Sequence, residues 1–231
     1  MKNTLLNRKA TIKIANALGE LNKDVVFVGG AMVSLYIDDP AAEDIRPTKD
    51  IDLTFQITTV GKLEQLRETL AKKGFTQTHE DDIICRFRYD DILVDVMSTV
   101  SVGWAPSNRW FMPGFQRAVK YYLEDVIIKI LPLTYFLASK MEAFFDRGIN
   151  DLYGSHDFED ILYIFNYTST LEQQVFSADE EVKLYLTECI KNILSRDKIL
   201  AVIPGHLYYE TADERFELIK SKLETIINAT H

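Results

Sequence analysis

Along the first part of the chain, apolar positions alternate between helical and extended spacing. Residues 3–20 carry apolar side chains at the spacing of an amphipathic helix. The run DVVFVGG (24–30) is rich in valine and ends in two glycines, which predicts a buried strand and a tight turn. Residues 31–37 then predict a helix, 50–57 a second strand, and 60–74 an amphipathic helix that ends at a glycine. This succession indicates an α+β domain.

The next stretch predicts further strands. The runs FTQTH (75–79), IICRFRY (83–89) and ILVDVMST (92–99) have the β-branched and aromatic content of strands. Residues 100–117 are irregular and rich in aromatic side chains, and residues 125–131 predict one more short strand. Roughly the first hundred residues should therefore build a sheet of about four or five strands.

Beyond this point the pattern is helical almost to the last residue. Apolar residues recur at helical spacing near 133–147, 156–167, 178–195 and 211–228. Neither an internal repeat nor a low-complexity linker interrupts the sequence. We therefore predict two parts, an α+β domain with a mixed sheet over residues 1–125 and a mainly helical domain over residues 126–231.

The composition is that of an ordinary globular protein, with 47% hydrophobic and 26% charged residues. The net charge of −9 argues against broad, non-specific binding of nucleic acid but leaves room for a local basic site. No run approaches the roughly 18 apolar residues of a membrane span, and the first residues do not read as a secretory signal. Cys85 and Cys189 form no metal or redox pattern. We expect a cytoplasmic protein without a membrane partner.

Two aspartates flank a single isoleucine at the start of the run DIDLTFQI. Because side chains alternate along a strand, Asp50 and Asp52 should point to one face and Ile51 to the other. Asp95 lies inside the apolar run ILVDVMST, where an unpaired charge would be costly to bury. Three carboxylates from two strands would suit a hard divalent cation such as Mg²⁺. A turn or edge strand with a solvated face is the alternative interpretation.

A double glycine precedes this acidic strand. Gly29 and Gly30 end one predicted strand and open a helix, where free backbone N–H groups favour an anion such as phosphate. A double glycine is weak evidence by itself, and the Asp-x-Asp pair on the next strand strengthens it. Arg46 and Lys49, beside the aspartates, could contact phosphate or only balance the carboxylates.

These motifs, VGGAMVSLY and RPTKDIDL followed by Asp95, resemble the signature of nucleotidyltransferases related to DNA polymerase β. The closer resemblance is to the AbiEii/AbiGii-type nucleotidyltransferases, toxins of abortive-infection and type IV toxin–antitoxin systems. That family has a second block, which SKMEAFFDRGINDLYGSHDFEDI resembles, with matching positions at Lys140, Ala143, Arg147, Asp157 and Asp160. One departure is His156, which stands where the family usually has lysine.

The resemblance implies in-line transfer of a nucleotide from an NTP, with Mg²⁺ as cofactor and Mn²⁺ as a second candidate. Asp50 and Asp52 would then bind the metal on the triphosphate. Asp95 would share a second metal and activate the attacking hydroxyl group. Gly29 and Gly30 would lie against the phosphates.

The resemblance also gives roles to the second block. Lys140 would neutralise charge on the leaving pyrophosphate, and Asp157 would position that lysine. Arg147 would help to bind the nucleotide, and Asp160 is a weaker candidate. Without the resemblance, the same charged helix positions would suit a structural ion-pair network.

By the same resemblance the protein would be a toxin with a separately encoded antitoxin, and RNA, including tRNA, would be the acceptor. Two alternatives stay open. A small-molecule nucleotidyltransferase, such as one that modifies an antibiotic, would have an acidic acceptor pocket. A non-catalytic partner-binding module could use the same scaffold, although the intact set of motif residues argues against it. The aromatic segment 103–117 could stack bases, but a structural role in covering the core is favoured.

Overall fold

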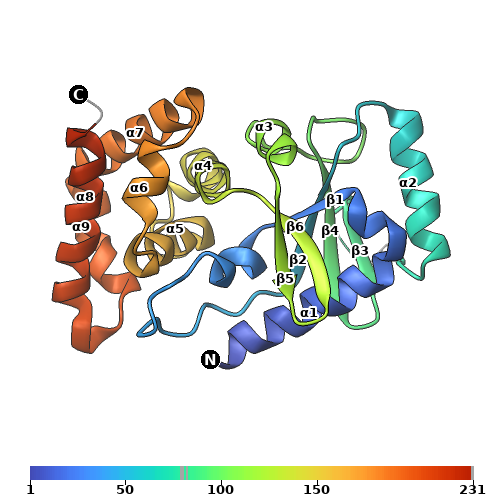
Figure 1. The fold of residues 1–231 in the computed structure, drawn as a ribbon, viewed down its shortest axis with the longest axis horizontal. Helices are drawn as coiled ribbons and strands as arrows, with labels where there is room; N and C mark the ends of the chain where they lie inside the picture. Colours follow the sequence, from blue (N-terminus) through green and yellow to red (C-terminus); the bar gives the residue numbers. More distant parts are fainter. Residues whose placement is uncertain (79–80, 82, 230–231) are drawn as a thin grey trace. The chain divides into compact units, whose positions relative to one another are not determined.

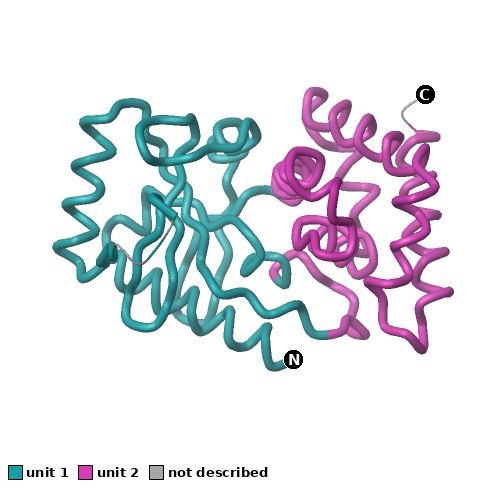
Figure 2. Tube along the Cα trace, turned by 180° about the vertical axis from the view of Figure 1, so that it is seen from behind, with its two compact units in different colours: residues 1–34, 44–132 teal, residues 35–43, 133–231 magenta. Residues whose placement is uncertain are grey.

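The chain forms two compact units, which Figure 2 shows in different colours. The computed structural model describes residues 1–78, 81 and 83–229. The first unit, here called the sheet unit, comprises residues 1–34 and 44–132. The second, the helical unit, comprises residues 35–43 and 133–231. Each unit is described separately below.

The sheet unit contains a six-stranded sheet in the order β3-β4-β2-β1-β6-β5 (Figure 1). The strands are β1 Val25–Val28, β2 Asp50–Phe55, β3 Arg86–Tyr89, β4 Ile92–Ser98, β5 Val119–Leu123 and β6 Val126–Ile130. β2 is parallel to β4 and β1 is parallel to β6, whereas the other neighbours are antiparallel. The predicted α+β class with a mixed sheet is confirmed.

Three local predictions differ from the structure. β5 was not predicted because its sequence, VKYYL, is mostly exposed and has no apolar run; it becomes a strand by pairing with β6. The strand predicted at 75–79 is wrong for the described residues, since Thr76 forms only an isolated bridge, and His79 lies outside them. The helix predicted at 31–37 is a 3₁₀ helix over Gly30–Leu35, the tighter form that is frequent in short connecting segments.

Helices cover the sheet through their apolar stripes. α1 (Lys2–Leu18) packs against β2 and β6 and continues into a 3₁₀ helix, Gly19–Lys23. α2 (Val60–Lys72) buries Leu63, Leu66 and Leu70, the stripe that its sequence predicts. A short helix, α3 (Phe111–Gln116), lies in the aromatic segment. The centre of the core is β1, in which every residue is buried.

The helical unit is built from helices around a buried aromatic and aliphatic core. Its α-helices are α4 Leu133–Ala143, α5 His156–Tyr167, α6 Leu171–Phe176, α7 Glu180–Leu194, α8 Asp197–Val202 and α9 Ala212–Asn228. α4 continues into a π-helical turn, Phe144–Gly148. α6 and α8 were not predicted because six residues are too few to show a periodicity. In the described part of the chain, no helix is both long and apolar enough to cross a membrane.

A segment from the N-terminal half completes the helical unit. The ring of Tyr36 lies 4.6 Å from that of Phe136. The backbone N–H groups of Asp38 and Asp39 both donate to the Tyr167 carbonyl, at 3.2 and 3.1 Å. The Asp38 carboxylate accepts hydrogen bonds from the backbone and the hydroxyl of Ser169. Residues 35–43 are therefore part of this unit's structure, although they precede β2 in sequence.

The first turn of α1 is capped by a residue far away in sequence. No side chain of its own N-cap satisfies the free N–H groups of this helix. Asp44 accepts from the backbone N–H of Asn3 at 2.7 Å and of Thr4 at 3.0 Å. Burial alone would raise the pKa of the Asp44 carboxyl, but these donors hold it below its ordinary value. Asp44 therefore ties the segment before β2 to the start of α1.

Asp44→Ala should lower the free energy of unfolding by about 1–2 kcal/mol, because it removes the cap of α1. Asp44→Asn keeps one acceptor oxygen and should lose less. Urea denaturation followed by circular dichroism measures both changes. Equal stability of the alanine variant and the unchanged protein would show that Asp44 does not cap the helix.

Candidate active site

The register of two parallel strands brings the three predicted carboxylates onto one face of the sheet. Asp52 of β2 is paired with Asp95 of β4, and Asp50 lies two residues before Asp52. Because side chains alternate, Asp50, Asp52 and Asp95 share a face. On the opposite face Ile51 and Val94 are buried, with 2% and 0% of their surface exposed. Because Ile51 and Val94 must stay buried, the two strands can pair in only one register, and this register keeps the three carboxylates together.

Arg86 lies between two of these carboxylates. β3 pairs with β4 so that Arg86 is opposite Asp95. Its guanidinium donates from Nε and Nη2 to the two oxygens of Asp95, both at 2.7 Å, and from Nη2 to Asp50 at 3.0 Å. The Arg86 and Asp95 side chains are 16% and 14% exposed. This forked, largely desolvated geometry is the strong form of an ion pair.

Burial and a neighbouring like charge both act on the Asp50 carboxyl. Burial and then the charge of Asp95 raise the pKa of the Asp50 carboxyl, and Arg86 and Arg46 only partly offset them. The hydrogen bonds to Asp95 hold the pKa of the Arg86 guanidinium above its ordinary value, so it stays charged. Among the described residues, no group of three or more acidic, cysteine or histidine side chains is arranged to hold a metal ion. The position between Asp50 and Asp95 is occupied by Arg86 instead.

Cys85 lies next to this cluster and takes no part in it as an anion. Burial, followed by the charge of Asp95, raises the pKa of the Cys85 thiol to about 11. The thiol is therefore neutral at physiological pH and is neither a nucleophile nor a good metal ligand.

The double glycine lies directly against the carboxylate cluster. Gly29 follows β1 with a φ of +72°, and a Cβ atom there would lie 1.7 Å from the Asp52 carboxylate. A Cβ on Gly30 would lie 2.3 Å from Nη2 of Arg46. Gly29 therefore needs glycine both for close approach and for its backbone conformation, whereas at Gly30 the nearest atom is the end of the flexible Arg46 side chain, which can move aside.

The second sequence block forms an ion-pair network in the helical unit that is buried at Lys140, Asp157 and Asp160 and exposed at Arg147. Lys140 of α4 is 7% exposed, and its Nζ lies 3.1 Å from Asp157 and 2.7 Å from Asp160, both in α5. Arg147, in the π-helical turn, donates to the second oxygen of Asp157 at 2.7 Å. His156 is largely exposed and lies 3.5 Å from Glu159, apart from this network.

The predicted site residues thus fall into two groups. Asp50, Asp52 and Asp95 gather in the sheet unit with both glycines and Arg46, and Lys49 lines a pocket that also includes Asp50. Lys140, Arg147, Asp157 and Asp160 gather in the helical unit. Sequence reasoning missed Arg86. The sequence did hold a sign of it. In the run RFRY the arginines Arg86 and Arg88 are two residues apart, so both point to one face of a strand, and the next strand carries Asp95.

The tryptophans of the aromatic segment contact other side chains of the sheet unit. Trp104 donates its indole N–H to Glu64 at 2.9 Å, and the Arg67 guanidinium lies 4.7 Å above its ring. Trp110 is buried, with Arg109 4.6 Å from its ring centre. These contacts match the role in covering the core that the sequence favoured.

Gly29→Ala should destabilise the protein by roughly 1–3 kcal/mol, because φ is positive and the new methyl group displaces the Asp52 carboxylate. Gly61→Ala is the matched control: it lies in α2 with open space around it, and it should be neutral or slightly stabilising. Thermal unfolding compares the two. Similar transition temperatures would show that the close approach at Gly29 carries no strain.

Asp157→Asn should cost about 3 kcal/mol at neutral pH, because it breaks a buried ion-pair network. Burial opposes ionisation, but Lys140 and Arg147 outweigh it and lower the pKa of the Asp157 carboxyl. A lowered pKa stabilises the folded state above the unfolded value of about 4, and this contribution disappears as pH falls. The difference between the two proteins should therefore shrink below about pH 4.

Chemical denaturation from pH 7 to pH 3 measures this difference. Asp213→Asn, an exposed carboxylate of α9, is the control and should change stability by less than about 0.5 kcal/mol. A difference for Asp157→Asn that stays constant with pH would contradict the ion-pair interpretation.

Of three comparisons with known proteins, two find a match. The family model described as "Nucleotidyl transferase AbiEii toxin, Type IV TA system" matches residues 14–224. A search of curated proteins finds no match. Among solved structures, the chain is similar to the crystal structure of an antigenic nucleotidyltransferase-like protein from Paracoccidioides brasiliensis. The identity is 18%, the TM-score 0.45, and the match covers 80% of this chain and 88% of that one. Because the family model spans both sequence blocks and most of the chain, the protein belongs to the AbiEii family of nucleotidyltransferase toxins of type IV toxin–antitoxin systems.

Proposed function

We propose that this nucleotidyltransferase transfers a nucleotide from an NTP to RNA, with tRNA as the favoured acceptor, and that it uses Mg²⁺. The observation that carries the proposal is the group of Asp50, Asp52 and Asp95 on one sheet face, with the Gly29 turn against Asp52. Membership of a toxin–antitoxin family also implies a cognate antitoxin as partner.

The carboxylate group fits a hard divalent cation in the chemistry of its donors. It supplies three carboxylates on one face, and burial, followed by the charge of Asp95, raises the pKa of the Asp50 carboxyl. Asp50, Asp52 and Asp95 would hold the ion, and Arg86 would have to leave Asp50 or Asp95 for them to do so. A bound divalent ion would supply charge neutralisation for the phosphates and lower the pKa of the attacking hydroxyl group. Mn²⁺ would satisfy the same oxygen ligands.

The residues of the chain would then contribute by position and charge. The backbone N–H groups at Gly29 and Gly30, in the turn that lies against Asp52, are proposed to bind phosphate oxygens. Asp95 is proposed to accept the proton of the acceptor hydroxyl group. By family resemblance, Lys140 and Arg147 are proposed to bind the nucleotide, with Asp157 orienting the lysine through their 3.1 Å contact.

The family assignment sets aside a non-catalytic partner-binding module, because the family is one of nucleotidyltransferases. A small-molecule acceptor remains the competing proposal. Nucleotide transfer to the hydroxyl or amine of an antibiotic-type molecule, together with no transfer to RNA, would establish a small-molecule acceptor.

Asp52→Ala should reduce nucleotide transfer by roughly a thousandfold or more, because a metal-binding carboxylate supplies several kcal/mol of transition-state stabilisation. The assay contains each α-labelled NTP in turn, total bacterial RNA and Mg²⁺, and the label that enters RNA is measured. Asp125→Ala, an exposed carboxylate in the turn between β5 and β6, is the control and should keep full activity.

Two results would contradict the proposal. A folded Asp52→Ala protein that still transfers nucleotides would remove Asp52 from the site. Transfer that is unchanged by EDTA would remove the metal.

A further inference from the structure

Arg86 is the charged residue of the site to which the proposed reaction gives no role. Its guanidinium donates to both oxygens of Asp95 at 2.7 Å and to Oδ2 of Asp50 at 3.0 Å. In the proposed function the same two carboxylates bind a divalent ion. Arg86 and that ion therefore need the same acceptor oxygens.

The forked contact of Arg86 leaves no place for a second cation between these carboxylates. Nε and Nη2 each take one oxygen of Asp95, and Nη2 also reaches Asp50. Because the Arg86 and Asp95 side chains are largely buried, water screens their charges only weakly. A divalent ion held by both carboxylates would lie next to the guanidinium, and the two cations would repel each other strongly. The ion and the guanidinium therefore exclude each other.

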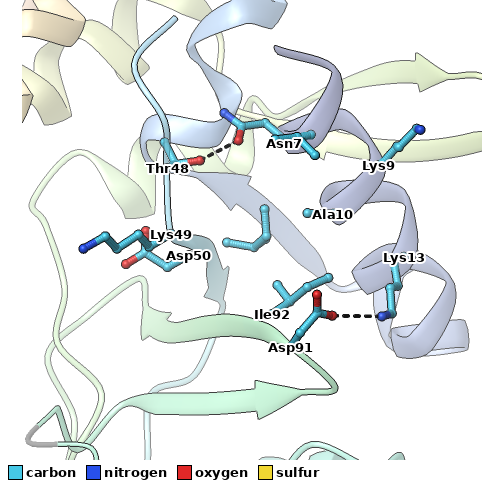
Figure 3. Close-up of a pocket in the computed structure, with 11 residues that line it drawn as sticks. Asn7, Lys9, Ala10, Lys13, Thr48, Lys49, Asp50, Asp91 and Ile92 are labelled. Carbon is cyan, nitrogen blue, oxygen red and sulfur yellow. Dashed lines mark hydrogen bonds and ion pairs between the residues drawn. The ribbon is translucent and has the colours of Figure 1, made fainter. Parts of the chain in front are cut away.

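The strands hold the two carboxylates at a fixed separation. β2 pairs with β4 along its whole length. Both strands are also tied to α1 close to where they begin, as Figure 3 shows. The Thr48 hydroxyl donates to Oδ1 of Asn7 at 2.8 Å, and Nζ of Lys13 lies 3.2 Å from the Asp91 carboxylate. The carboxylates therefore stay as far apart as one guanidinium spans, and they do not separate to admit a second cation.

Arg88 provides a comparison within the same strand. It lies two residues after Arg86 in β3, so its side chain leaves the strand on the same face. Its guanidinium donates from Nε and Nη2 to the two oxygens of Asp81, at 2.9 and 2.8 Å. Asp81 is outside the proposed metal site. The two arginines thus share strand, face and forked geometry but bind different carboxylates.

We propose that Arg86 is a built-in counter-ion of the metal site, which competes with the divalent ion for Asp50 and Asp95 and so sets the metal concentration at which the enzyme becomes active. The inference rests on the proposed function, in which these carboxylates bind Mg²⁺. As counter-ion, Arg86 keeps the buried carboxylates paired. Metal binding breaks its three hydrogen bonds, and their loss lowers the metal affinity. The alternative is a purely structural arginine that stays on Asp95 when the metal binds.

The test is direct binding of Mn²⁺, measured from the electron paramagnetic resonance signal of the free ion, with neither NTP nor RNA present. Arg86→Gln should bind Mn²⁺ about tenfold to a hundredfold more tightly than the unchanged protein, because the competing hydrogen bonds between charged groups are gone. Arg88→Gln removes the same charge from the same strand face and should change Mn²⁺ affinity by less than about threefold.

Thermal unfolding gives a second measurement of the competition. In EDTA, Arg86→Gln should unfold several degrees below the unchanged protein, because its buried carboxylates lose their partner. Mn²⁺ should raise the unfolding temperature of this variant more than that of the unchanged protein. Arg86→Lys keeps the charge but not the fork, so its Mn²⁺ affinity should lie between those of the other two proteins. The lysine variant also tests the inference if the glutamine variant does not fold.

Three results would overturn the inference and leave the proposed function intact. Equal Mn²⁺ affinity of Arg86→Gln and the unchanged protein would show that Arg86 does not compete. An equal gain in Arg88→Gln would show that net charge alone acts. Tight binding that survives Asp52→Ala in the Arg86→Gln protein would place the ion elsewhere. Conversely, the expected gain in Mn²⁺ affinity, together with no nucleotide transfer by the unchanged protein, would refute the proposed function and leave the role of Arg86 standing.

Discussion

The interaction on which the site depends is the ion cluster of Arg86 with Asp50 and Asp95. Carboxylates on one strand face repel each other, and burial makes that repulsion stronger than it would be in water. The guanidinium holds them together with two bonds to Asp95 and one to Asp50. Because Arg86 is on β3 and the carboxylates are on β2 and β4, the cluster also joins three neighbouring strands. The same charges that are proposed to bind a metal thus already contribute to the cohesion of the sheet.

Sequence reasoning reached the carboxylates because alternation is a local property. Asp50 and Asp52 could be placed on one face from strand geometry alone, and Asp95 was added as a third carboxylate from a neighbouring strand because a charge inside its apolar run needs a partner. Arg86 could not be placed in this way, since its position depends on the antiparallel register of β3 with β4, which no local pattern specifies. Likewise, the family resemblance related Lys140 to Asp157, but the near-complete burial of Lys140 could not be foreseen.

The fold was predictable to the extent that each element carries its own pattern. The apolar stripe of α2 and the valine run of β1 have such patterns, and both elements were predicted. β5 has no such pattern, because it is a strand only through its pairing with β6. The assignment of residues 35–43 to the helical unit depends on contacts with Tyr167 and Ser169, more than a hundred residues away in sequence. The contact of α1 with the segment before β2 is of the same kind, because Asp44 and Thr48 form hydrogen bonds with residues of α1 that lie about forty positions earlier in the sequence.

The division of the chain has a consequence for how the protein could be taken apart. The polypeptide passes between the two units at 34/35, at 43/44 and at 132/133. A single cut at any of these places leaves the units covalently joined through the others. Neither unit is a contiguous cassette, so expressing residues 133–231 by themselves would omit Tyr36 and Asp38 from the helical core. Recombination between related genes would exchange an intact helical unit only if both crossover points enclosed residues 35–43 as well.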